Sequence, residues 1–300
     1  MAEQNQNKRL WVWWVVAIIL VVCVAAIAIL GVLYVQQRQE RPALVQPSQV
    51  QPAPVRPEQA ALPIKPLVDR HYVFAGNPRP MPSFQGQIQV LTNIGYLVGY
   101  SEERKDPVWV GYRLFKISSL QAPKRPRQFM VDARTAARVT STDYTGSGFD
   151  RGHMSPNYAI AICYGRSAQL ETFLMSNITP QKQKLNRGIW NNFERIAIRN
   201  YAQNLEEIWV LTGGIFESNE HLASGVKVPS SCFKILVDEQ NGKPRVLAFI
   251  IGQNITGTES ITNFLTSVDL IEQKTGLDFL GELPDDVEDE LEAGVAGRVW

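Results

Sequence analysis

Cysteine and histidine are both scarce in this chain of 300 residues, which contains three of each. Cys23 lies in an apolar N-terminal run, so only Cys163 and Cys232 remain for the rest of the chain and cannot build a disulfide framework. These two thiols could pair outside a reducing compartment or stay apart as buried side chains, and the sequence leaves both open. We interpret His71 and His221 as structural, so histidine chemistry depends on His153.

Charge is absent from residues 10–35, which read LWVWWVVAIILVVCVAAIAILGVLYV. At about 1.5 Å per residue, a helix of this length crosses a hydrocarbon core of roughly 30 Å. Tryptophans at one end and Tyr34 at the other suit the two membrane interfaces. A cleaved signal peptide has an apolar region of only about 7–15 residues, so we predict an uncleaved anchor in the lipid bilayer.

Residues 36–66 lack the apolar content needed to fold and contain seven prolines among many glutamines. The sequence therefore predicts a head over residues 1–9, an anchor over 10–35, a linker over 36–66 and one domain over 67–300. Basic residues flank both ends of the anchor, and we expect the N-terminus inside. The head does not resemble a transit peptide. We expect a bacterial inner membrane with the domain in the periplasm or outside, the mitochondrial inner membrane being the alternative.

A net charge of only +1 conceals an uneven charge distribution. Residues 104–199 contain 16 Lys and Arg against 6 Asp and Glu, whereas residues 282–292 contain seven acidic residues and no basic ones. A basic centre favours a cleft for a polyanion such as a nucleic acid.

Apolar alternation with period two predicts strands within residues 87–101, 107–117, 208–216, 232–239 and 245–251. Asn241-Gly242 predicts a hairpin between the last two strands. Helical patterns occupy residues 168–175, 188–204 and 260–276, and Gly276 is a C-cap candidate. There are no internal repeats, and the irregular order of elements predicts an α+β fold with a largely antiparallel sheet.

His153 belongs to the stretch YTGSGFDRGHMSPN, residues 144–157, and polar residues follow in SNITPQKQKLNRGIWNNFERIAIRN. Asn186 and Glu194 are eight positions apart, which is about 80° beyond two helical turns, so both can face one side of a helix. A segment carrying His153 against this helix would form a small polar pocket.

These motifs resemble the DNA/RNA non-specific endonucleases, a family of ββα-metal (His-Me finger) nucleases that includes endonuclease G. Residues 150–153, DRGH, match the family signature, and so does the pattern N-x-x-P-Q…N-x-G-x-W-x-x-x-E through residues 177–194. The resemblance extends over nearly all of residues 67–292. It implies a ββα-metal nuclease fold and hydrolysis of DNA and RNA phosphodiesters.

The resemblance also implies roles for individual residues. His153 would be the general base, Asn186 the single protein ligand of Mg²⁺ (with Mn²⁺ as a substitute), and Glu194 the holder of metal-bound waters. Arg151 and either Arg125 or Arg127 would bind the phosphate. Asp150 would orient the substrate-binding loop or pair with an arginine.

Ile198 departs from the family pattern because an arginine is expected one turn after the glutamate. We expect Arg195 or Arg199 to take over this phosphate contact, or the contact to be lost. Two other functions compete with a membrane-anchored endonuclease: a catalytically silent, tethered nucleic-acid-binding protein and a phosphodiesterase acting on small nucleotides. A homodimer is a further possible partner arrangement.

Overall fold

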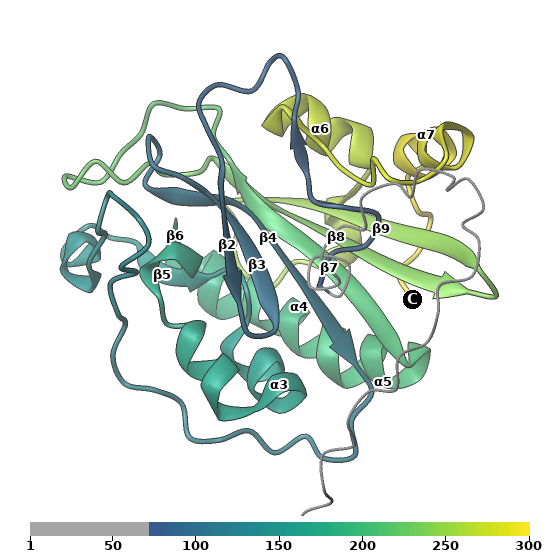
Figure 1. Cartoon of the computed structure of the whole chain (residues 1–300), viewed down its shortest axis with the longest axis horizontal. Helices are drawn as coiled ribbons and strands as arrows, with labels where there is room; N and C mark the ends of the chain where they lie inside the picture. The colour runs from purple at the N-terminus through teal and green to yellow at the C-terminus, as the bar shows by residue number, and fades with distance from the viewer. Residues whose placement is uncertain (1–71) are drawn as a thin grey trace, which may run out of the picture. The chain divides into compact units, whose positions relative to one another are not determined.

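The computed structural model describes residues 72–300, and its central element is a seven-stranded sheet in which every neighbouring pair is antiparallel. The strand order is β10-β9-β8-β7-β4-β3-β2 (Figure 1). The strands are β2 (Gln89–Asn93), β3 (Tyr96–Ser101), β4 (Asp106–Phe115), β7 (Glu207–Ile215), β8 (Ser231–Gln240), β9 (Lys243–Gly252) and β10 (Leu265–Thr266). The expected antiparallel α+β fold is confirmed.

The predicted strands are present, and their turns follow from local sequence. Residues 87–101 form the β2–β3 hairpin, in which Asn93 pairs with Tyr96 and Gly95 adopts a positive φ. Asn241 and Gly242 both have positive φ between β8 and β9, as a tight hairpin turn requires. These two hairpins fix the register of β2 against β3 and of β8 against β9.

The sheet is covered on both faces (Figure 1). On one face, Val110 and Tyr112 of β4 pack into a cluster with Trp190 of the long helical segment. On the other, Trp109 of β4 packs with Val268 of α6. The α-helices are α3 (Asn157–Glu171), α4 (Asn191–Ile196), α5 (Ala202–Leu205), α6 (Val268–Thr275) and α7 (Asp285–Ala293).

The long helix predicted at residues 188–204 exists, but it begins earlier. A helical run extends from Leu185 to Leu205 through η3 (Leu185–Trp190), α4, η4 (Ala197–Tyr201) and α5. The segments η3 and η4 have π-helical hydrogen bonding. This run carries the second half of the sequence motif along one face of the sheet.

Two helix predictions are wrong in their bounds. The helix predicted at 168–175 is α3, which begins at Asn157 after Pro156, and its non-helical Gly165, with φ of 86°, obscures the apolar periodicity. The helix predicted at 260–276 is divided into η5 (Ile261–Phe264), β10 and α6, because Ser267 caps α6 by accepting from the Leu270 amide. Gly276 is the predicted left-handed C-cap.

Short elements complete the described chain. Strands β1 (Arg79–Pro80) and β11 (Leu277–Asp278) pair with each other, and β5 (Asp150–His153) pairs with β6 (Ile178–Gln181). The remaining short helices are η1 (Ser141–Tyr144) and η2 (Met175–Asn177). The predicted anchor, linker and head lie outside residues 72–300, and among those described residues no helix has the length and apolar character of a membrane span.

Candidate active site

The DRGH stretch forms β5, which pairs antiparallel with β6, and the Leu185–Leu205 helical run follows β6 directly. Gly152 pairs with Thr179, and a Cβ on Gly152 would lie only 2.2 Å from the Gln181 side-chain oxygen. Only glycine fits at this close approach. The strand–strand–helix order implied by the resemblance is therefore present, and it places His153 at the end of β5.

Two motif residues, Asn177 and Trp190, fix the backbone at and just after His153. Asn177 is fully buried, and its side chain accepts from the Ser155 amide at 2.8 Å and donates to the Ser155 and Thr172 carbonyls. Trp190 Nε1 donates to the His153 carbonyl at 3.3 Å. The turn after β5 and the helix are thus both fixed to the strand that carries the histidine.

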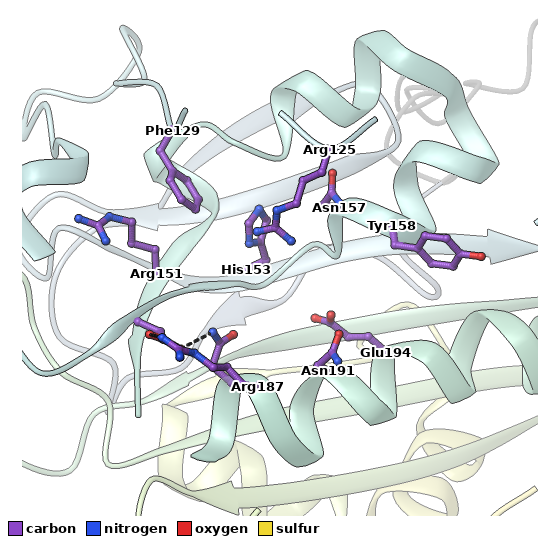
Figure 2. A pocket seen from close by; sticks show the side chains of 11 residues that line it. Arg125, Phe129, Arg151, His153, Asn157, Tyr158, Arg187, Asn191 and Glu194 are labelled. Atoms are coloured by element: carbon purple, nitrogen blue, oxygen red, sulfur yellow. Dashed lines mark hydrogen bonds and ion pairs between the residues drawn. The ribbon is translucent and has the colours of Figure 1, made fainter. Parts of the chain in front are cut away.

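A cavity of about 440 Å³ opens where β5 meets the helix (Figure 2). His153, Asn186 and Glu194, which the sequence motif joins, all line it. The predicted polar pocket is therefore confirmed. The full lining is Arg125, Phe129, Asp150, Arg151, His153, Asn157, Tyr158, Asn186, Arg187, Asn191 and Glu194.

His153 is 8% exposed and lies between two aromatic rings. Its ring centroid is 5.5 Å from that of Phe129 and 4.9 Å from that of Phe173. Its Nε2 has no hydrogen-bond partner in the described part of the chain. Burial, with the positive charge of Arg125, lowers the pKa of His153 from 6.5 to about 3, so its imidazole is neutral and can act as a proton acceptor.

Asp150 organises the other side of the cavity. Its carboxylate accepts two hydrogen bonds from Arg187, both of 2.7 Å, and one of 2.9 Å from Asn186 Nδ2. Although burial raises it, these contacts hold the pKa of Asp150 below its usual value. Because an ionised carboxylate only accepts hydrogen bonds, the amide nitrogen of Asn186 must face Asp150, and its carbonyl oxygen remains free to bind a ligand.

Glu194 lies on α4, the segment of the helical run that follows η3 and Asn186. Its Oε1 is buried without a hydrogen-bond partner among the described residues. Figure 2 shows its carboxylate pointing from the helix towards His153 and Arg125. Burial raises the pKa of Glu194, while the positive charges of Lys234 and Arg125 oppose this shift. Glu194 lines the cavity, and a carboxylate there is suited to hold water or a hydrated ion.

Lys234, on β8, is a functional candidate that the sequence motifs did not identify. It is 1% exposed, its Nζ donates to the Tyr112 hydroxyl at 3.3 Å, and its Nζ lies 4.2 Å from the Trp190 ring centroid. Burial lowers its pKa, and the Glu194 carboxylate acts in the opposite direction. Its place in the period-two pattern of a buried strand was the available signal, because a lysine at such a position needs a partner.

The predicted phosphate-binding arginines occupy different positions. Arg125 lines the cavity, with its guanidinium carbon 5.2 Å from the Phe173 ring centroid, whereas Arg127 is exposed and is not part of the lining. Arg151 also lines the cavity, but its guanidinium donates to the Ser141 carbonyl and the Thr145 hydroxyl. Arg125 is therefore the arginine with a guanidinium directed at the space beside His153 (Figure 2).

The position of the missing family arginine is filled by Ile198, which is fully buried in the core. Arg195 is exposed and does not line the cavity. Arg199 Nη2 donates to the Tyr158 hydroxyl at 2.9 Å, and Tyr158 lines the cavity. Neither arginine lines the cavity, and only Arg199 contacts a residue that does. Asn157, Tyr158, Arg187 and Asn191 are lining residues that the sequence analysis did not assign.

Cys163 and Cys232 are both free thiols, which resolves the alternative that the sequence left open. Cys163 is half-buried, and the fully buried Cys232 accepts a hydrogen bond from Gln181 Nε2 at 3.5 Å. Burial raises the pKa of the Cys232 thiol to about 12. Both thiols remain protonated at neutral pH and have no evident catalytic role.

Comparison with known proteins agrees with this geometry. Residues 76–286 match the family model described as DNA/RNA non-specific endonuclease. Human mitochondrial endonuclease G is 30% identical over 214 residues, covering 65% of this chain and 70% of that protein. A nuclease from Nostoc is 30% identical over 212 residues, covering 67% and 76%.

Matches at lower sequence identity are also nucleases or contain one. The mitochondrial nuclease EXOG of Xenopus laevis is 27% identical over 64% of this chain, which spans 58% of that relative's length. A crystal structure of an EndoG/EndoGI complex superposes with a TM-score of 0.60 at 25% identity, covering 67% of this chain and 89% of the other. The chain therefore belongs to the DNA/RNA non-specific endonuclease family of nucleic-acid hydrolases.

Proposed function

We propose that this chain is a Mg²⁺-dependent endonuclease that hydrolyses DNA and RNA without selecting the sugar, and that it acts while anchored to a membrane. The observation that carries the catalytic part is the neutral imidazole of His153, at the wall of a cavity shared with Asn186 and Glu194. A buried base beside two oxygen donors is the equipment that phosphodiester hydrolysis needs.

The donor set fits a hydrated Mg²⁺. Asn186 offers one carbonyl oxygen, held in place by its amide hydrogen bond to Asp150, and Glu194 offers a carboxylate with an orphaned buried oxygen. Mg²⁺ prefers oxygen ligands and keeps several waters, so one direct ligand and one carboxylate that holds waters are sufficient. Bound Mg²⁺, or Mn²⁺ in its place, would supply positive charge to the phosphate and the leaving oxygen.

His153 would remove a proton from the attacking water. A base with a pKa of about 3 is weak, but a bound phosphodiester brings a negative charge beside the imidazole. A negative charge stabilises imidazolium, so the pKa of His153 rises on substrate binding. Arg125 would bind a phosphate oxygen, and Arg151, held by Ser141, would support the loop next to it.

We also expect cleavage with little preference for the base, because of the residues that line the cavity. The cationic residues there, Arg125, Arg151 and Arg187, suit the phosphate groups that all nucleic acids share. The basic segment from residue 104 to residue 199 favours a long polyanion over a small nucleotide.

Membrane attachment is supported by the sequence alone. The charge-free run at residues 10–35 would anchor the chain in a bacterial inner membrane, and the proline-rich residues 36–66 would separate the nuclease domain from the bilayer, on the periplasmic side. Fusion of a topology reporter after residue 66 tests this part. Reporter activity characteristic of the cytoplasm would contradict it.

Incubation of the purified protein with plasmid DNA, single-stranded DNA and RNA tests the catalytic part. We expect all three to be cut in Mg²⁺ and none in excess chelator, with a rate that falls steeply as salt rises. Binding without cleavage at any Mg²⁺ concentration would instead favour the silent binding protein, and cleavage confined to small nucleotides would favour the phosphodiesterase.

A further inference from the structure

Three carboxylates meet where α6 and α7 pack together, on the sheet face away from the candidate active site (Figure 1). They belong to Asp269 and Glu272 on α6 and to Glu292 on α7. One oxygen from each lies within 4.8 Å of the others. Two helices whose carboxylates are twenty or more positions apart in sequence therefore form a compact set of oxygen donors.

Glu292 shows that this cluster is more than an acidic surface. It is only 6% exposed, and its Oε1 is buried with no hydrogen-bond partner in the described part of the chain. It also lies in the last turn of α7, where the helix dipole disfavours a negative charge. A buried carboxylate without a partner is costly, so its position between two other carboxylates requires a compensating positive charge or a proton.

The side chains of the described residues do not provide this positive charge. Across residues 72–300, no Lys or Arg forms an ion pair with any of the three carboxylates. Lys274 of α6 instead pairs with Glu217 at 2.6 Å, and Arg79 pairs with Glu282 at 3.9 Å.

The surrounding groups add to the repulsion. The further charged groups beside Glu292, Glu288 and Asp278, are acidic like Asp269 and Glu272. The local field is one that a cation would relieve.

We propose that Asp269, Glu272 and Glu292 bind one Ca²⁺ that joins α7 to α6. The three oxygens, all within 4.8 Å of one another, are close enough to share one ion, and Ca²⁺ accepts irregular oxygen geometry whereas Mg²⁺ demands a near-ideal octahedron. Glu272 Oε1 accepts from the Phe279 amide at 2.7 Å, which fixes this carboxylate in place.

The burial gradient across the site suits an ion that keeps some water. Glu292 closes the inner side, Glu272 is half-buried, and Asp269 is exposed to solvent. Waters would complete the six to eight oxygen ligands that Ca²⁺ takes, on the side of Asp269. The ion would fix the acidic C-terminal helix on the fold and would not take part in phosphodiester cleavage.

Thermal unfolding of the full chain, purified in detergent and freed of metal by chelation, tests the site. The Asn186→Ala variant serves as background because it weakens the ion proposed at the active site. Added Ca²⁺ should raise Tm by roughly 5–10 °C at a concentration about 100 times Kd. The same concentration of Mg²⁺ should raise it less.

Adding Glu292→Gln should raise Tm in chelator, because repulsion is relieved, and should abolish the response to Ca²⁺. Glu290→Gln removes one charge from an exposed position of the same helix and should keep the full response. If the Glu292 variant fails to fold, Asp269→Asn, at the exposed rim, should show the loss of response instead. The proposal would be overturned if Ca²⁺ left the Tm of the Asn186→Ala protein unchanged. It would also be overturned if a folded Glu292→Gln or Asp269→Asn variant kept the full rise in Tm with Ca²⁺.

Discussion

The side-chain amide of Asn186 donates to the carboxylate of Asp150, with 2.9 Å between Nδ2 and Oδ2. This contact leaves the Asn186 carbonyl oxygen available to bind an ion. Asp150 therefore acts on the proposed metal site through its neighbour, as a positioning residue.

Replacing Asp150 by Ala should raise the Mg²⁺ concentration needed for half-maximal cleavage by about 10–100-fold, because Asn186 loses the acceptor that orients it. Arg187→Ala is the matched control, since it removes the other partner of Asp150 and keeps the Asn186 contact. We expect no increase in the Mg²⁺ requirement for this control. Equal increases in both variants would show that the ion pair, and not the orientation of Asn186, matters.

Arg125 and Arg127 offer a second matched pair, two positions apart. Arg125 lines the cavity beside His153, and Arg127 is exposed outside it. Arg125→Ala should lower kcat/KM by roughly 10–100-fold, as loss of a charged hydrogen bond of about 1.5–3 kcal/mol implies. Arg127→Ala should change it by less than about threefold. A larger loss in the Arg127 variant would reverse the assignment.

The stability of the protein should depend on pH through His153. Its pKa is about 3 in the folded chain and near 6.5 when unfolded, so between these values the unfolded state binds the extra proton. The contribution of His153 to stability is therefore complete above about pH 6.5 and is lost as pH falls towards 3, by up to about 1.4 kcal/mol per pH unit. Denaturant unfolding of wild type and His153→Gln from pH 7 to pH 4 measures this. Parallel curves would show that His153 is not held neutral.

Lys234 should set the acid limb of the pH–rate profile through Glu194. Its positive charge favours the ionised carboxylate, so Lys234→Met should raise the pKa of Glu194 and move the acid limb of kcat/KM to higher pH. Tyr112→Phe removes the hydrogen bond from Lys234 but keeps the charge, and serves as control. If the acid limb did not move in the Lys234→Met variant, Lys234 would not control the ionisation of Glu194.

The sequence predicted the parts of this structure that local patterns determine. Apolar alternation identified the central strands, and Asn241-Gly242 identified a hairpin. The order of the motif residues predicted that His153, Asn186 and Glu194 would line one pocket. Where tertiary contacts decide, the predictions were wrong or silent. The start of α3 was missed because Gly165 breaks its pattern.

Side-chain partners were the hardest part to predict. The Arg187 ion pair with Asp150 and the burial of Lys234 beside Trp190 depend on how β5, the helix and β8 come together. The choice between Arg125 and Arg127 likewise depends on which side chain reaches the cavity wall. No spacing rule within a single segment contains that information.

The most direct test of the assigned site is the single-turnover cleavage rate of plasmid DNA as a function of Mg²⁺, measured for wild type and three variants. His153→Ala should lower the rate by about 10²–10⁴-fold at every Mg²⁺ concentration while DNA binding stays intact. Asn186→Ala and Glu194→Ala should shift the titration to higher Mg²⁺ as well as slow cleavage. Four identical titration curves, or no cleavage by wild type at any Mg²⁺ concentration, would contradict the assignment of these three residues.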